Sequence, residues 1–493
     1  MTDNSRVLSG FRAELIAKTV GIISGTTLLI LLSRLLGTDD YGRLSLALSV
    51  FSFGFLFANF GFPKSGARYI TEYVQKDTSK IRFILRITTL YIIVSTVVVC
   101  GLLLVFNPII DQNLSGREIQ PLLAVGILYI AAQSFASYPH RMFQALGAPE
   151  LGSLVKTLIG ICNLLFVLVF IYIGWGAIGA VVGYTLSLTL VAGISIVLLY
   201  SRFYTQYETD TGFDWELAQK IFEYNFSLAA TSGARAIEKE IDILMIGVFL
   251  SPTMVGIYSV GKRVTTKLNA PAGALGFSLS PLYSERKLSS GVSEAGQLYR
   301  EGLTKVLLLY VPAVVGLMLV ARPLIQYVFG AEYLPGAMAL QILSLLALLR
   351  SVGNITASGL DYLGRAKQRA WLKTTTTVAN VILNFVLIPT VGVVGAAIAT
   401  VSSYSVYMFG NVAIMQTELN FVSREFVKDV GLTCFSALLM AIPVYLFRDN
   451  ISGIFSLFAV ISIGIAVWLI IVYMFGLIKK EEMTTLLSLS SRN

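Results

Sequence analysis

Long apolar stretches alternate with short polar segments along the whole chain. Each stretch holds about 20 residues or more, which is the length that an α-helix needs to cross the hydrocarbon core of a bilayer. A spanning segment must also pair its own backbone N–H and C=O groups, because lipid offers no hydrogen-bond partner. The pattern therefore predicts an all-α integral membrane protein with about fourteen transmembrane helices, over residues 11–36, 41–62, 83–106, 119–140, 151–173, 176–200, 220–250, 254–283, 303–321, 336–362, 370–389, 393–416, 426–447 and 451–478.

Internal matches relate the first six predicted helices to the next six. LGTDDYGRLS at 36–45 resembles LSPTMVGIYS at 250–259, and GAIGAVVG at 176–183 resembles GVVGAAIA at 392–399. Between these pairs, four residues recur in the same order, and Gly147, Lys156, Thr157 and Asn163 match Gly364, Lys373, Thr374 and Asn380. The nearly constant spacing of the three matches indicates an internal duplication.

The duplication predicts how the chain is organised. A repeat of six helices, an even number, begins and ends on the same side of the membrane, so both copies have one orientation as parallel repeats. The polar stretch 201–216 marks the boundary between them. We therefore expect an N-terminal six-helix lobe at 1–205, a C-terminal six-helix lobe at 206–420, and two extra helices with a cytoplasmic tail at 421–493.

The composition excludes several other classes of protein. Of the 493 residues, 55% are hydrophobic and 13% are charged, whereas soluble globular proteins carry about 25% charged residues. The three cysteines lie inside apolar runs and there is one histidine, which argues against a disulfide framework, a zinc site and a histidine-based triad. We expect no metal, no cofactor and no catalytic residue. The first apolar stretch lacks a cleavage site, so we expect an uncleaved span.

Lysine and arginine concentrate on alternate polar segments. If the N-terminus is cytoplasmic, most of the 37 Lys and Arg residues fall on the cytoplasmic side. The outer segments then hold only Arg34, Arg43, Arg117, Arg322 and Arg448. By the positive-inside rule, we expect both termini in the cytoplasm and the chain in the cytoplasmic (plasma) membrane.

The seventh predicted helix carries charged residues at membrane depth. Arg235, Glu238, Lys239 and Asp242 are spaced i, i+3, i+4 and i+7, which places them on one helix face. Glu240 points elsewhere. Charged side chains in a membrane helix are costly unless they are paired or hydrated. This face is therefore a candidate functional feature.

The eighth predicted helix carries the bases Lys262, Arg263 and Lys267. If the hairpin turns near residue 252, these bases lie at depths similar to those of the charges on the seventh helix. Two interpretations stay open: a salt-bridged hairpin that locks the two helices together, and a hydrated cavity that attracts an anionic group. Pro271, which is followed by two glycines, predicts a bend in the same helix.

The balance of charge in the spans favours the cavity. Bases outnumber acids in the seventh and eighth helices, and Lys18 and Arg350 add cations in the first and tenth. Glu14 is expected to pair with Lys18 at i, i+4. Pairing alone does not need surplus bases, but a phosphate-bearing substrate does, because Lys and Arg are the natural partners of phosphate.

Three stretches carry a resemblance to a known family. SRLLGTDDYGRLSLA at 33–47, GFPKSGARYI at 61–70 and DILMIGVFLSPTMVGIYSVGKR at 242–263, within fourteen duplicated spans, resemble polysaccharide biosynthesis flippases of the Wzx/RfbX type. These belong to the multidrug/oligosaccharidyl-lipid/polysaccharide (MOP) superfamily. The resemblance covers essentially the whole chain. It implies two six-helix lobes that open alternately inward and outward around a cationic cavity.

The resemblance also implies a substrate and the residues that bind it. The substrate is a polyprenyl-(pyro)phosphate-linked oligosaccharide, and the implied partners are membrane lipid, Na⁺ or H⁺ for coupling, and a glycan polymerase or glycosyltransferases of the same pathway, with no nucleic acid. The basic residues expected at the substrate are Lys18, Arg235, Lys239, Lys262, Arg263, Lys267 and Arg350. The acids expected as counter-ions or coupling groups are Glu14, Glu238 and Asp242.

Other functions fit the sequence less well. A cation-coupled multidrug exporter of the same superfamily is the main alternative, but that branch often uses carboxylates buried in the first lobe, where only Glu14 lies in a span. A membrane polymerase or ligase needs a large outer loop with acid/base residues, and the outer loops here are short. A scaffold has no use for surplus charge in its helices.

Overall fold

The structure is a computed structural model in which residues 3–113, 119–207 and 212–477 are described. Over these residues, every regular element is a helix, as the apolar pattern predicts. The α-helices are α1 (Asp3–Asn59), α2 (Phe62–Lys76), α3 (Lys80–Asn113), α4 (Gln120–Ala145), α5 (Pro149–Tyr172), α6 (Gly176–Leu199), α7 (Trp215–Phe249), α8 (Pro252–Leu268), α9 (Ala270–Ser289), α10 (Val292–Leu324), α11 (Ala337–Tyr362), α12 (Ala366–Val391), α13 (Val393–Leu419), α14 (Arg424–Phe447) and α15 (Ile454–Met474). Four short π- or 3₁₀-helices join them, η1 (Tyr200–Tyr204), η2 (Ile325–Phe329), η3 (Ala331–Gly336) and η4 (Arg448–Asn450).

Eleven helical stretches in this described part of the chain are long and apolar enough to cross a membrane. The first, Ser9–Lys76, contains both α1 and α2, and α1 is itself interrupted at Gly37, where φ is 69°. This interruption separates the first two predicted spans. Helices α7, α8 and α9 lie outside the eleven, and α8 has only 17 residues. The all-α, multi-span prediction is confirmed, and the number fourteen stays a prediction.

The chain divides into two compact units, residues 1–256 and 257–493. Helix α7 belongs to the first unit because it packs against α1, α2 and α3. The predicted boundary between the two six-helix lobes, after residue 205, comes from the internal sequence matches, and it stays a prediction. Helix α8 crosses from one unit into the other, so its bases belong to the second unit and its first turn to the first.

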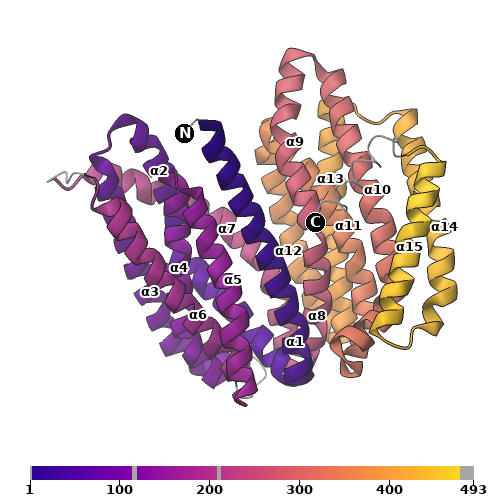
Figure 1. Cartoon of the computed structure of the whole chain (residues 1–493), viewed down its shortest axis with the longest axis horizontal. Coiled ribbons are helices and arrows are strands. Elements are labelled where there is room, and N and C mark those ends of the chain that lie inside the picture. Colours follow the sequence, from indigo (N-terminus) through magenta and orange to yellow (C-terminus); the bar gives the residue numbers. More distant parts are fainter. Residues whose placement is uncertain (1–2, 114–118, 208–211, 478–493) are drawn as a thin grey trace. The chain divides into compact units, whose positions relative to one another are not determined.

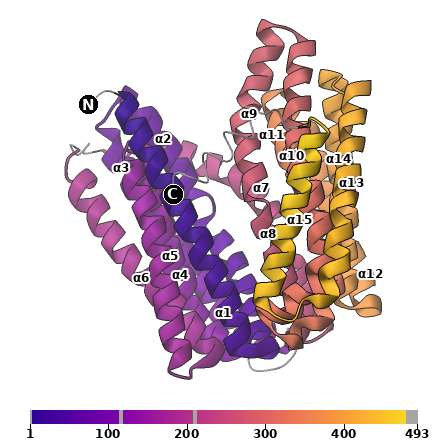
Figure 2. The same ribbon diagram turned by 45° about the vertical axis from the view of Figure 1, so that its right-hand side comes forward.

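In the first unit, α1 packs against α4, α5 and α6, and α4 and α6 lie side by side (Figures 1 and 2). Small residues bring helices close: a Cβ at Gly183 of α6 would lie 2.6 Å from the Cα of Val167 on α5. Close backbone approach of this kind is how helices pack in lipid, where no hydrophobic force drives them together. A second cluster of fully buried residues, around Ile70, Ile84 and Ile221, joins α2, α3 and α7.

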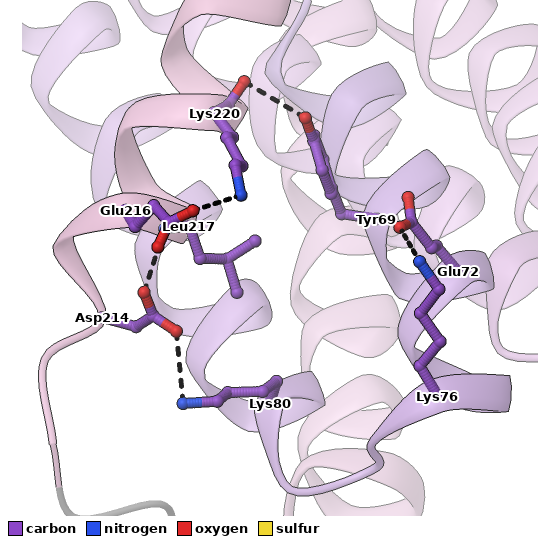
Figure 3. A network of polar contacts seen from close by, with 8 residues as sticks. All are labelled: Tyr69, Glu72, Lys76, Lys80, Asp214, Glu216, Leu217 and Lys220. Carbon is purple, nitrogen blue, oxygen red and sulfur yellow. Dashed lines mark hydrogen bonds and ion pairs between the residues drawn. The ribbon is translucent and has the colours of Figure 1, made fainter.

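Polar contacts tie the start of α7 to α2 and α3 (Figure 3). Asp214 accepts a hydrogen bond from the Leu217 N–H at 3.0 Å, which caps α7, and pairs with Lys80 of α3 at 3.2 Å. The Tyr69 hydroxyl of α2 donates to the Lys220 carbonyl at 3.3 Å. The apolar pattern does not predict α2, because its 15 residues are too few and too polar to span a membrane.

In the second unit, α9, α10, α11 and α13 surround a core rich in aromatic rings. Tyr283, Tyr299 and Phe421 are almost completely buried, and the rings of Tyr299 and Phe421 meet edge to face with centroids 4.7 Å apart. Helices α14 and α15 lie side by side at the edge of this unit, next to α10 (Figures 1 and 2). They correspond to the two helices predicted outside the duplication.

Matched residues of the duplication adopt the same turn in both units, where α4 meets α5 and where α11 meets α12. Gly147 and Gly364 are both left-handed, with φ of 75° and 78°. Each turn has the same two backbone hydrogen bonds at matched positions and equal lengths, Gly147 to Gln144 and Gly364 to Asp361 at 3.3 Å, and Ala148 to Phe143 and Arg365 to Leu360 at 2.9 Å. Glycine accepts a positive φ without the steric cost that a Cβ brings.

The two copies of the first repeated motif also contact each other within the first unit. A Cβ at Gly42 would overlap the Pro252 carbonyl, so only glycine permits this approach. The Thr253 hydroxyl donates to an Asp39 carboxylate oxygen at 3.1 Å. Asp39 and Thr253 occupy matched positions of the two copies, as Gly42 and Gly256 do.

In both units, the helical chain is broken after the first repeated motif. A side-chain hydroxyl from the next long helix stabilises each of these breaks. In the first unit, α1 ends before Phe60 and Gly61, whose φ angles are 41° and 84°, and the Ser95 hydroxyl of α3 donates to the Ala58 carbonyl at 2.5 Å. The bond supplies a partner for a carbonyl at the helix end, which has none within the helix.

In the second unit, the break lies at Asn269 between α8 and α9, next to the bend predicted at Pro271. The Tyr310 hydroxyl of α10 donates to the Leu268 carbonyl at 2.6 Å and accepts from the Ala272 N–H at 3.2 Å. It is therefore inserted into the i→i−4 hydrogen bond that would otherwise join Ala272 to Leu268. A side chain inserted into this ladder is a recognised cause of a kink.

Candidate functional site

Glu14 on α1 is paired with a lysine of another helix. Its carboxylate contacts Lys156 Nζ on α5 at 2.5 Å and accepts a hydrogen bond from the Ser153 hydroxyl at 3.0 Å. The predicted pairing of Glu14 with Lys18 is therefore wrong, because α5 packs beside α1 and brings a closer base. Lys18 is exposed and has no ion pair among the residues that the structure describes.

Glu240 of α7 is a polar residue at the site that the sequence analysis missed. It is 7% exposed, accepts a hydrogen bond from Ser49 of α1 at 2.9 Å, and pairs with Lys239 at 2.9 Å. The side chain of Lys239 is 71% exposed. The sequence did contain a sign that Glu240 is buried. Glu240 shares a helix face with Ile243, which is buried, and with Gly247, which packs against Leu46 of α1.

The other charged residues predicted on α7 differ in their surroundings. Asp242 is completely buried, and Glu238 is half-buried. The side chain of Arg235 lies outside the described residues. The sequence predicts that these charges lie near the bases of α8. That contact would be between the two compact units, and it stays a prediction.

The bases of α8 lie together in the second unit. Lys262 is 5% exposed, and its ammonium lies 5.8 Å from the centre of the Tyr258 ring. Arg263 and Lys267 are half-buried and lie one turn apart on the helix. A long side chain can bury its apolar stem and keep its charged end hydrated.

Helices α8 and α9 run alongside α11, which brings Arg350 near the same depth as Lys267. A Cβ at Gly261 would lie 3.6 Å from the Cα of Leu340, and a Cβ at Gly276 would lie 3.0 Å from the carbonyl oxygen of Asn354. These two contacts show that the helices run in the same direction. Counting along both helices places Lys267 and Arg350 within about one turn of each other.

Arg350 faces an aromatic ring and a second base. Its guanidinium carbon lies 5.7 Å from the centre of the Tyr404 ring on α13, and Lys373 Nζ of α12 lies 5.2 Å from the same ring. The Lys373 ammonium is also 4.4 Å from the centre of the Tyr407 ring. The sequence analysis missed Lys373 and Tyr404 as site residues, although Lys373 is one of the repeated residues.

Asp361, an acid on α11, already has a partner. Asp361 accepts two hydrogen bonds from Arg369, each 2.8 Å long. Arg350 has no ion pair among the residues that the structure describes. The second unit therefore holds two groups of bases, one on α8 and one around Tyr404.

A family model described as polysaccharide biosynthesis protein matches residues 31–338. Over 275 residues, the chain is 26% identical to the probable low-salt glycan biosynthesis flippase Agl15 of Haloferax volcanii, a match that covers 55% of this chain and 58% of that protein. Over 366 residues, it is 24% identical to the lipopolysaccharide biosynthesis protein WzxC of Escherichia coli, covering 72% and 69%. The chain thus spans less than two thirds of the first relative's length.

Two solved structures have the same fold. The lipid II flippase MurJ in an inward closed conformation matches with a TM-score of 0.70 and 17% identity, over 94% of this chain and 98% of that chain. An inward-facing multidrug resistance MATE family transporter of the MOP superfamily matches with a TM-score of 0.64 and 15% identity, over 84% and 99%. At these identities the likeness concerns the fold alone.

Proposed function

The chain belongs to the family of polysaccharide biosynthesis proteins, and from this premise we propose that it is a flippase, a transporter and not an enzyme. Its substrate is a polyprenyl-(pyro)phosphate-linked oligosaccharide, which it moves from the inner to the outer leaflet of the cytoplasmic membrane by alternating access. The observation that carries this proposal is the surplus of bases in apolar helices of the second unit. Both relatives described above are named for glycan or lipopolysaccharide biosynthesis.

We further propose fourteen spans, arranged as two six-helix lobes plus α14 and α15, with both termini in the cytoplasm. The first lobe is 1–205, the second is 206–420, and the rest follows at 421–493. The identical turns at Gly147 and Gly364 support the duplication. The cytoplasmic excess of Lys and Arg supports the orientation.

In this mechanism, bases bind the charged end of the substrate. Lys262, Arg263 and Lys267 of α8, with Arg350 of α11, hold the phosphate oxygens through charge-assisted hydrogen bonds. Lys18, Arg235 and Lys239 add positive charge from the first unit. Lys18 and Lys239 are supported by their exposure, which lets an anion reach them.

The acids have separate roles in the proposal. Glu238 and Asp242 serve as counter-ions or as groups that couple transport to Na⁺ or H⁺. Glu14 holds Lys156 through its ion pair, which leaves Lys18 free for substrate. The break between α8 and α9 lets the bases of α8 move without unfolding the helices, because Tyr310 supplies hydrogen bonds at the break.

The cation-coupled multidrug exporter is the second candidate, and the fold likeness to a MATE transporter favours it. The two functions differ in the charge of the cargo. An exporter of cationic drugs needs acids that are free to bind a cation, and in the first unit Glu14 is occupied by Lys156. Loss of an exporter would cause drug sensitivity and leave surface glycan intact.

The decisive experiment removes the gene and follows lipid-linked glycan. A flippase defect traps the glycan on the cytoplasmic leaflet and depletes it at the surface. The bases of α8 are then reversed singly and together, as Lys262→Glu, Arg263→Glu and Lys267→Glu, with the exposed Lys428→Glu as the matched control. We expect the triple variant to accumulate glycan inside and the control to behave as wild type. Retained flipping by the triple variant would overturn the assignment of these bases.

A further inference from the structure

Glu240 and Lys239, neighbours on α7 in the first unit, form an ion pair that the proposed transport cycle has not yet used in full. Glu240 is buried, Lys239 is exposed, and the Lys239 ammonium lies 2.9 Å from Glu240 Oε1. Ten residues, or about 15 Å, separate Lys239 from the end of α7 at Phe249. This distance is about half the thickness of a bilayer core. Charged side chains at such a depth face water or a polar partner.

The carboxylate of the pair is held in place from α1. The Ser49 hydroxyl donates to Glu240 Oε2 at 2.9 Å, and Ser49 is itself buried. The two helices approach closely nearby, since a Cβ at Gly247 of α7 would lie 2.5 Å from Leu46 Cδ1 of α1. Dense packing leaves a buried side chain few other positions. A change of partner within the pair therefore requires the lysine to move and the carboxylate to stay.

The position of the lysine on the helix makes such a change easy. Neighbouring residues of an α-helix point about 100° apart and do not face each other. Lys239 must therefore bend along the helix surface to bring its ammonium to Glu240. A lysine has three N–H donors on a flexible four-carbon stem. An anion in the adjacent water can bind these donors and draw the ammonium away from the carboxylate.

A second buried carboxylate shows how a structural ion pair differs. The Glu418 side chain of α13 is as little exposed as that of Glu240, at 9%, but it pairs with two bases, Lys287 and Arg365. Their side chains are 30% and 44% exposed, whereas that of Lys239 is 71% exposed. Glu418 joins three segments of the second unit. Glu240 instead places its charge beside a base that is open to a ligand.

The negative charge of Glu240 acts mainly on Lys239. The facing helix α1 carries no Asp, Glu, Lys or Arg after Arg43. Helices α2 and α3 contact α7 near Lys220, which is 20 residues, or about 30 Å, from Glu240. Glu238 and Asp242 lie two residues to either side on α7 and point to other faces of the helix.

We propose that Glu240 is a counter-ion that weakens the hold of Lys239 on the phosphate of the substrate and so permits its release. This role rests on the proposed flippase function. A carboxylate 2.9 Å from the ammonium offsets part of its attraction for a phosphate oxyanion. A carrier needs this, because a ligand that binds too tightly dissociates slowly. Glu240 acts through Lys239 and does not contact the substrate, so it is a positioning residue.

The binding test uses the full-length protein in nanodiscs and titrates it with pyrophosphate by calorimetry. Glu240→Gln keeps the shape of the side chain and an oxygen for Ser49, and it should bind pyrophosphate about tenfold more tightly than wild type. Lys239→Gln should bind about tenfold more weakly. Glu216→Gln, an exposed acid of α7 that pairs with Lys220, is the matched control and should bind as wild type does. Equal or weaker binding by Glu240→Gln overturns the proposal.

A double variant shows whether Glu240 acts through the lysine. In a chain that already carries Lys239→Gln, adding Glu240→Gln should change the affinity by less than about threefold. A full tenfold gain in that background would contradict the assigned route. The thermal midpoint of each variant verifies its folding. If Glu240→Gln does not fold, Glu240→Asp carries the test, because it draws the charge back from Lys239 by one methylene. It should bind about twofold more tightly, and no gain would contradict the proposal.

Transport of lipid-linked glycan in vesicles distinguishes release from folding. Glu240→Gln should lower the half-saturating glycan concentration and the maximal rate together, each about tenfold, because the substrate binds more tightly and leaves more slowly. A merely structural role would lower the rate without tightening binding. Tighter binding with a wild-type maximal rate would contradict the role in release.

Failure of this role and failure of the flippase function give different results. A wild type that moves no lipid-linked glycan would contradict the function itself, and the pyrophosphate titrations would still decide whether Glu240 acts on Lys239. A wild type that moves glycan, with Glu240→Gln equal to it in binding and in rate, would contradict only the role of Glu240.

Discussion

Two lysines at matched positions of the duplication have different partners. Lys156 in the first unit pairs with Glu14 at 2.5 Å. Lys373 in the second unit lies over the rings of Tyr404 and Tyr407, at 5.2 and 4.4 Å. The preceding turns have the same backbone geometry in both units, so the difference lies in the side chains around each lysine and not in the helices that carry it.

The residues at the matched positions around the two lysines also differ. At the positions that match Glu14 and Tyr404, the chain has Leu228 and Leu188, by the spacing of the repeats. An acid pairs with the first lysine, whereas the second lies beside two tyrosine rings.

The largest effect is expected when a carboxylate is placed beside the bases of the second unit, as Glu14 lies beside Lys156 in the first unit. Tyr404→Glu places a carboxylate between Arg350 and Lys373. Because it occupies both bases at once, we expect transport of an acidic lipid-linked glycan to fall about a hundredfold, which corresponds to two charge-assisted hydrogen bonds. Transport in vesicles measures this.

Tyr404→Gln is the control for that substitution, because it removes the ring without adding charge. It should reduce transport less than Tyr404→Glu does. Equal loss in both variants would show that transport depends on the ring of Tyr404 and is not affected by the added carboxylate.

The helix breaks offer the next comparison. Tyr310→Phe leaves both the Leu268 carbonyl and the Ala272 N–H without the hydroxyl, and we expect a loss of about 1–3 kcal/mol in the free energy of unfolding. Ser95→Ala deprives only the Ala58 carbonyl, so it should cost about half as much. Chemical denaturation in mixed micelles measures both. A smaller loss for Tyr310→Phe than for Ser95→Ala would contradict the role assigned to the inserted hydroxyl.

A neutral substitution of each matched lysine tests the comparison directly. Lys373→Gln should reduce transport of an acidic glycan about tenfold, and Lys156→Gln should change it less than about threefold, because its charge is already neutralised. Initial rates at matched protein levels in vesicles give the ratio. Equal losses would place both lysines at the substrate.

The smallest effect is expected at Glu14. The pair with Lys156 is partly exposed, with side-chain exposures of 42% and 40%, and such pairs contribute about 0.2–1 kcal/mol. Glu14→Gln should lower the free energy of unfolding by no more than that and leave transport near wild type. A severe transport defect with normal folding would instead indicate a direct role of Glu14 in coupling.

Much of the fold could be predicted from the sequence, because lipid sets strict limits on length and hydrophobicity. Helices α4, α5, α6 and α11 begin and end within a few residues of their predicted stretches. Helix α2 could not be predicted in this way, since an amphipathic helix at the end of a span leaves no long apolar run. The break at Asn269 was indicated by Pro271, but the hydroxyl that stabilises it comes from α10.

The candidate site was harder to predict, because partners of charged side chains come from distant parts of the chain. Glu14 and Lys18 have ideal spacing for a helical pair, yet Lys156, far along the chain, takes the carboxylate. Glu240 lies off the charged face of α7, and its buried hydrogen bond comes from Ser49 of α1, far along the chain. The spacing of residues along one helix does not show which residues of a neighbouring helix will contact them.

The sequence by itself determined that this chain is an all-helical, multi-span membrane protein, and it predicted a duplication and a surplus of bases over acids in the helices. Each of these follows from local patterns, which the chain carries whatever its tertiary contacts. Only the tertiary structure decided which base is neutralised and which is left over an aromatic ring. That choice depends on helix packing within a few ångströms, since electrostatic attraction and hydrogen bonding act between neighbours in space.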